Sequence, residues 1–160
     1  MKLTMLSLLL VLSQSGNQVT LSNNIEQNGK AIKIVDGDTF DLLTKEKTVL
    51  RIRMNGIDCP ERRQDFYQSA KKALSGYIFS KEVNLVTNGH DRNKRIIATV
   101  FCNGENINLA MIRDGYAWHY KKYSADTSFA EAENQARRNK KGLWNMNNPV
   151  APWEFRKTSR

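Results

Sequence analysis

Five short segments in which apolar and polar residues alternate constrain the fold of this chain most strongly. An alternation with a period of two residues is typical of strands that bury one face. The apolar positions are Ile32 and Ile34, then Phe40 and Leu42, then Leu50, Ile52 and Met54, followed by apolar segments at 83–86 and 96–101. Turns are expected at residues 36–37 and 45–47, and a loop around Asn88 and Gly89. The chain should therefore contain five closely spaced strands.

Three helices are expected from apolar residues spaced at 3.6 positions. They cover residues 66–79, 107–113 and 128–140. Gly115 and Gly142 follow the second and third helices as stop signals, and Thr127 or Ser128 is expected to cap the third. Five strands with an intervening helix predict an α+β fold, a small closed five-stranded OB-type β-barrel with three helices.

The N-terminal residues have the composition of an export signal. Lys2 precedes a stretch from Leu3 to Leu12 that is apolar apart from Thr4 and Ser7, and small residues follow. This pattern predicts a signal peptide over 1–15, too short for a stable membrane span, and a buried N-terminal helix is the alternative. Residues 16–29 are expected to be a flexible leader, 30–145 the folded domain, and 146–160 an irregular C-terminal tail. The protein is then exported, to the periplasm or beyond the cell.

Charge and cysteine content narrow the range of partners. The chain of 160 residues carries a formal charge of +9, and removal of 1–15 takes away one lysine and no acid. Such a basic domain favours polyanionic partners, although charge alone is weak evidence. Cys59 and Cys102 are not expected to form a disulfide, and their spacing does not suit zinc.

Five charged residues form the candidate site: Asp38, Arg53, Asp58, Glu61 and Arg95. Carboxylates can hold a hard cation, and a further carboxylate can deprotonate water. Two guanidinium groups can grip a phosphate with paired donors. Each residue taken singly is also explained as a solvated turn or strand-end charge. Their joint occurrence indicates a metal-assisted phosphodiesterase.

The local sequence predicts where the three acids of this site lie. Asp38 shares strand parity with Phe40 and Leu42, which predicts a carboxylate on the barrel rim. Asp36 fits better as a turn residue that bonds its own backbone. Pro60, between Asp58 and Glu61, fixes the turn that carries both acids.

Several motifs in order make the chain resemble the staphylococcal nuclease family, especially its exported Gram-negative members. They lie at residues 36–39, at Arg53 with 57–61, at 92–95, at 108–110 with 115–117, and at 130–133 through 142–144. The resemblance implies an OB barrel and a Ca²⁺-dependent endonuclease that cleaves DNA and RNA with little sequence preference and leaves 3′-phosphates. It also implies roles for single residues. Asp38, Asp58 and the Cys59 carbonyl would bind Ca²⁺, while Arg53, Glu61 and Arg95 would be catalytic and Glu61 the general base.

Departures from the family pattern affect the rim of the site. Cys59 replaces Thr or Ala, Lys94 replaces a Gly before Arg95, and the loop after Glu61 is short. Tyr120, Tyr123 and Lys94 are candidate substrate-binding residues, with single-stranded or denatured nucleic acid as the preferred substrate. Packing beneath the third helix is an equal alternative for the two tyrosines. His119 is expected on the surface.

Two other functions compete with the nuclease. The domain could be a non-catalytic nucleic-acid-binding OB module, or a basic structural or adhesion protein. The complete set of acids and arginines favours the enzyme over both. The fold needs no partner to bury its core, so a monomer is expected, with no membrane association after signal cleavage.

Overall fold

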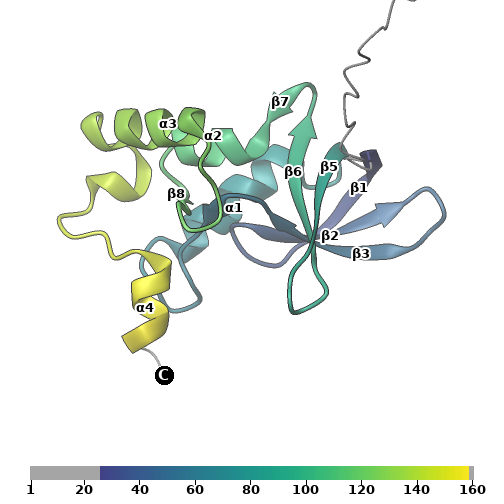
Figure 1. The fold of residues 1–160 in the computed structure, drawn as a ribbon, viewed down its shortest axis with the longest axis horizontal. Helices are drawn as coiled ribbons and strands as arrows, with labels where there is room; N and C mark the ends of the chain where they lie inside the picture. The colour runs from purple at the N-terminus through teal and green to yellow at the C-terminus, as the bar shows by residue number, and fades with distance from the viewer. Residues whose placement is uncertain (1–25, 159–160) are drawn as a thin grey trace, which may run out of the picture.

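A closed barrel of antiparallel strands with one parallel junction forms the body of the protein in the computed structural model, which describes residues 26–158 (Figure 1). The strands run in the order β3-β2-β1-β5-β6, and the parallel pairing of β3 with β6 closes the barrel. Their bounds are β1 (Glu26–Ile34), β2 (Thr39–Thr44), β3 (Val49–Met54), β5 (Glu82–His90) and β6 (Ile96–Cys102). The predicted five-stranded OB-type α+β fold is confirmed.

Three two-residue strands attach other segments to this barrel. β7 (Glu105–Asn106) extends the sheet beyond β6, while β4 (Ile57–Asp58) pairs with β8 (Trp118–His119) in a small separate sheet. This second sheet matters for function because it brings the chain after β3 against the segment after the second helix.

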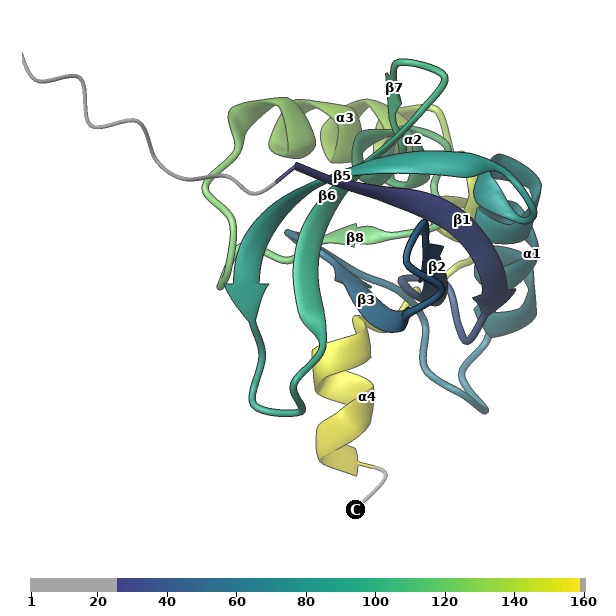
Figure 2. The ribbon, with the colours of Figure 1, turned by 90° about the vertical axis from the view of Figure 1, so that its right-hand side faces the viewer.

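Four α-helices surround the barrel on different sides. They are α1 (Tyr67–Ile78), α2 (Ile107–Arg113), α3 (Thr127–Arg138) and α4 (Pro152–Thr158), with a 3₁₀ turn, η1, at Gly142–Asn145. α2 and α3 cover one end, and α4 lies at the opposite end, where the β5–β6 turn also projects (Figure 2). No helix among residues 26–158 is long and apolar enough to cross a membrane.

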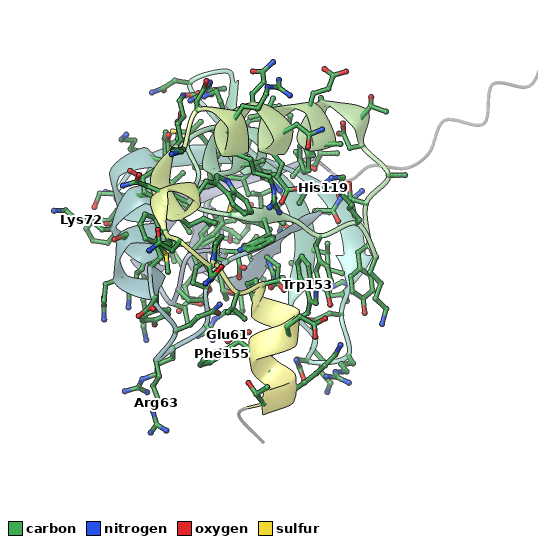
Figure 3. All side chains as sticks on the ribbon, turned by 90° about the vertical axis from the view of Figure 1, so that its left-hand side faces the viewer. Glu61, Arg63, Lys72, His119, Trp153 and Phe155 are labelled. Carbon is green, nitrogen blue, oxygen red and sulfur yellow. The ribbon has the colours of Figure 1, made fainter. Side chains whose placement is uncertain are left out.

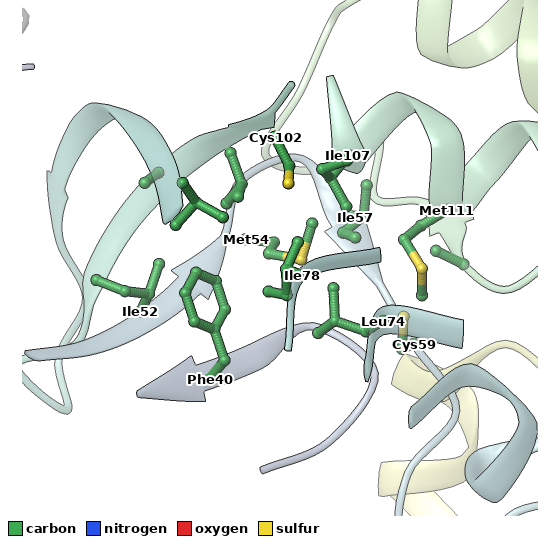
Figure 4. Close-up of a cluster of buried hydrophobic side chains, with 14 of the residues drawn as sticks. Phe40, Ile52, Met54, Ile57, Cys59, Leu74, Ile78, Cys102, Ile107 and Met111 are labelled. Carbon is green, nitrogen blue, oxygen red and sulfur yellow. The ribbon is translucent and has the colours of Figure 1, made fainter. Parts of the chain in front are cut away.

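The core fills the barrel and the space under α1 and α2 (Figure 4). Inward residues of the strands, such as Phe40 and Ile52, meet the apolar face of α1, which buries Leu74 and Ile78. Cys59 and Cys102 are both buried as free thiols. Leu143 and Trp144 are buried in a second cluster beside Trp118.

Three local predictions were wrong. β5 continues through Gly89 to His90, so the turn lies at residues 91–95 and not around Asn88. The side chain of Asp126 caps α3, in place of Thr127 or Ser128. His119 is 3% exposed and packs edge-on against Phe129, so it is not a surface residue.

The chain ends also differ from expectation. Residues 152–158 of the predicted irregular tail form α4. β1 starts at Glu26, so the last four residues of the predicted leader belong to the barrel. The predicted signal peptide and the rest of the leader lie outside the described residues.

Gly115 and Gly142 hold the ends of α2 and α3 together by close backbone contact. Both have positive φ, and a Cβ on Gly142 would lie 2.3 Å from the Gly115 carbonyl oxygen. The Leu143 N–H donates to the same oxygen at 2.8 Å. Side chains are therefore excluded from this junction.

Gly142→Ala should lower the free energy of unfolding by about 3 kcal/mol, from left-handed strain and the backbone clash. Gly76→Ala is the matched control, because an added Cβ there meets nothing within 4 Å and the site is mid-helix. It should raise stability by about 0.5–1 kcal/mol. Urea unfolding gives the free energy of unfolding of both variants. An equal change in that free energy for Gly142→Ala and Gly76→Ala would contradict the close contact at residues 115 and 142.

Candidate active site

Two buried carboxylates share one guanidinium at the centre of the candidate site. Arg53 projects from β3 with Nη1 3.1 Å from Oδ2 of Asp38 and Nη2 3.0 Å from Oδ1 of Asp58. Arg53 also donates from Nη1 to the Met54 carbonyl at 3.0 Å. The side chains of Asp38 and Asp58 are only 8% and 3% exposed. The structure thus brings three of the predicted site residues into direct contact.

The turn before β2 explains how Asp38 reaches this position. Asp36 accepts the Asp38 N–H at 3.1 Å and so acts as the expected turn residue. A Cβ on Gly37 would lie 2.8 Å from that of Cys59, so only glycine permits the turn to approach this closely. The Cys59 N–H then donates to Oδ2 of Asp38 at 2.7 Å. The backbone beside Asp58 thus directly fixes the carboxylate of Asp38.

Burial disfavours the ionised forms of Asp38 and Asp58. Burial raises the pKa of Asp38 to about 8, although Arg53 opposes the shift. Burial likewise raises the pKa of Asp58 against the effect of Arg156 and Arg53. Such a pair gains most from a further cation, because a cation offsets the loss of water around the ionised oxygens.

Glu61 lies at the rim and meets an unexpected partner. Its Oε1 accepts from Nη1 of Arg156 at 2.5 Å, and Nη2 of Arg156 donates to Oδ2 of Asp58 at 2.7 Å. Glu61 lies beside α4, which carries Arg156 (Figure 3). Gln64 closes the turn by accepting the Glu61 N–H at 2.9 Å. The predicted base is therefore next to the predicted metal ligand, and one arginine joins them.

Arg95 reaches the edge of the site and not its centre. Its Nε donates to Asp91 at 2.7 Å, and Nη1 donates to the Thr39 hydroxyl at 3.4 Å. Thr39 in turn donates to Oδ1 of Asp38. Lys94 adopts a φ of 60°, the left-handed conformation that a glycine would take more easily. The turn of residues 91–95 is thus held by Asp91 with Arg95 directed toward Asp38.

The candidate base-stacking tyrosines differ in accessibility. Trp153 of α4 stacks on Tyr120 with ring centroids 5.1 Å apart and planes 5° from parallel. Tyr123 is 64% exposed and meets Tyr120 edge-on at 4.8 Å. A nucleotide base therefore cannot use the face of Tyr120 that Trp153 covers while α4 is in place.

An open groove of about 750 Å³ continues from Arg156 along β8 and α4. Its lining includes one acid, Glu133, and three large aromatic side chains, which are Trp118, Tyr120 and Trp153. The cations that line it are Arg92, Lys121, Lys122, Arg137, Arg156 and Lys157. A groove with this charge and with aromatic rings suits a polyanionic strand whose bases stack.

Asp38 and Asp58 fit a hard divalent cation as the start of its ligand set. Both are buried oxygen donors around one guanidinium, and the backbone of Cys59 adjoins Asp38. Among residues 26–158, no three or more His, Cys, Asp or Glu side chains gather to hold a metal alone. Ca²⁺ takes six to eight oxygens in loose geometry, so carbonyl, water and phosphate oxygens would complete the shell.

Sequence reasoning missed Arg156 and Trp153, because the tail was expected to be irregular. Both project from one face of α4, three residues apart. A tryptophan followed by an arginine at helical spacing was the available signal.

Comparison with known proteins places the site in a family context. A family profile described as "Staphylococcal nuclease homologue" matches residues 51–146. An "Uncharacterized endonuclease" of Haemophilus influenzae is 40% identical over 131 residues, covering 82% of this chain and 74% of that protein. "Protein ParB" of Escherichia coli is 37% identical and covers 84% of this chain and 81% of its own length. A "Micrococcal nuclease" of Shigella flexneri is 35% identical and covers 82% of each.

The raised pKa of Asp38 predicts how stability depends on pH without metal. An acid with a raised pKa binds its proton more tightly in the folded state than in the unfolded state, so stability falls as pH rises from about 4 to about 8. The melting temperature in EGTA should therefore drop between pH 5 and pH 8. Asp38→Asn should flatten this slope, and an unchanged slope in that variant would refute the assignment.

Proposed function

Because the chain belongs to the staphylococcal nuclease family, a family of nucleic-acid hydrolases, we propose that it is a Ca²⁺-dependent endonuclease of DNA and RNA. Low sequence specificity, a preference for single-stranded or denatured substrate and 3′-phosphate products are parts of the proposal. The observation that carries it is the buried pair of Asp38 and Asp58 around Arg53, with Glu61 and Arg95 at its rim.

The site residues support a separate role for each charged side chain in the proposed reaction. Asp38 and Asp58, with the Cys59 carbonyl, would hold Ca²⁺, which as a Lewis acid would polarise the phosphoryl oxygen. Glu61 is 39% exposed and so can accept a proton from an attacking water. Arg53 lies against both buried acids, where it can bind a phosphate oxygen. Arg95 would bind a second oxygen and stabilise the charge that develops there.

The basic groove supports the proposed substrate. Its cations can neutralise successive phosphates of one strand, and Tyr123 offers an exposed ring to a base. None of these contacts reads base edges in a duplex, which agrees with low sequence specificity. A monomer exported to the periplasm or medium is the form proposed, from the N-terminal sequence and the self-contained core.

Glu61→Gln should lower the rate on heat-denatured DNA with Ca²⁺ by about 10²–10³-fold, since the amide cannot take the proton. Glu131→Gln makes the same change on an exposed position of α3 and should leave the rate unchanged. Gel analysis of the products with Ca²⁺ or EGTA measures both. Binding of DNA without hydrolysis by the unaltered protein would instead support a non-catalytic OB module.

A further inference from the structure

The most unexpected contact in the molecule is made by Arg156, from a helix that lies beyond the residues matched by the family profile. Its Nη1 and Nη2 lie 3.2 and 2.7 Å from the two oxygens of Asp58, and Nη1 also bonds Glu61. One guanidinium thus engages the proposed metal ligand and the proposed base together.

These bonds leave Asp58 no free access for a cation. Its Oδ1 accepts from Arg53 and Arg156, its Oδ2 accepts from Arg156, and the side chain is 3% exposed. Of the two arginines, Arg53 is 15% exposed and Arg156 is 38% exposed. A cation approaching from solvent therefore reaches Asp58 by displacing Arg156.

The charge of the cluster favours such an exchange. When all three carboxylates are ionised, they face two guanidinium groups, and the cluster carries one net negative charge. A divalent cation added beside both arginines would make the cluster net positive, whereas exchange for Arg156 brings it to neutrality. Like charges close together in a buried site repel strongly, so the cation and Arg156 exclude each other.

The attachment of α4 permits Arg156 to leave. Pro152 is the one residue of α4 that is buried, and Trp153 holds the helix by its ring contacts with Trp118 and Tyr120. A cavity of about 180 Å³ lies between the segment after Pro60 and the chain around Val150 and Phe155. Segments with few buried contacts open at low free-energy cost.

We propose that Arg156 is an internal competitor of the metal: it occupies Asp58 and Glu61 in the metal-free protein, and divalent cation binding releases it together with α4. The C-terminal helix thereby couples metal binding to the opening of the groove, where Trp153 covers Tyr120. This inference rests on the proposed function, because it takes Asp58 as a metal ligand.

Calorimetric titration of CaCl₂ into the metal-free protein tests the competition. Arg156→Ala should bind Ca²⁺ at least about tenfold more tightly than Lys157→Ala, and Arg156→Lys should lie between them. Lys157→Ala is the matched control because it removes the same charge from the same helix. The Lys157 side chain bonds Glu154 and not the acids of the site. Equal or weaker affinity in Arg156→Ala would overturn the proposal.

Hydrogen exchange of the unaltered protein gives a test that needs no variant. Amides of residues 153–158 should exchange faster with saturating Ca²⁺ than with EGTA, while those of α1 should not change. Slower or unchanged exchange at α4 would overturn the release. If neither the unaltered protein nor Arg156→Ala binds Ca²⁺, the proposed metal function itself fails. Ca²⁺ binding with the same affinity in both proteins would instead overturn only the competition by Arg156.

Discussion

The burial of two carboxylates around the Arg53 guanidinium is the interaction on which the rest of the site depends. Isolated buried charges are costly. Asp38 and Asp58 are stabilised at the edge of the core by Arg53, by the Cys59 N–H and by Arg156. This compensation is incomplete, as the raised pKa of both acids shows. The barrel supplies the positions: β3 presents Arg53, and the turn at Gly37 closes onto Cys59.

Other charged side chains surround this central cluster of Arg53 and the two acids. Glu61 and Arg95 stand at the rim, one held by Arg156 and the other by Asp91. Each is thus restrained by a counter-charge that a substrate phosphate, or a cation, could replace. The basic groove begins beside Arg156. Its lysine and arginine side chains attract a polyanion and so bring it close to the acids of the site.

Much of this could be predicted from the sequence. Period-two alternation identified the barrel strands because one face of each is buried, and the same alternation grouped Asp38 with the buried Phe40. Tertiary context decided what could not be predicted. The local sequence around Gly89 predicts a loop, but pairing with β6 extends β5 past Gly89 to His90. α4 is short and charged, and Trp153 is held by Trp118 and Tyr120, more than thirty positions earlier in the chain.

The central claim is that Asp38 and Asp58 form a divalent cation site that serves phosphodiester hydrolysis. The most direct measurement is the Ca²⁺ dependence of hydrolysis of denatured DNA by Asp58→Asn, compared with Asp65→Asn, which alters an exposed acid of the neighbouring loop. We predict that Asp65→Asn keeps the Ca²⁺ response of the unaltered protein and that Asp58→Asn needs far more Ca²⁺ or loses hydrolysis. Full hydrolysis by Asp58→Asn at the same Ca²⁺ concentration would contradict the account.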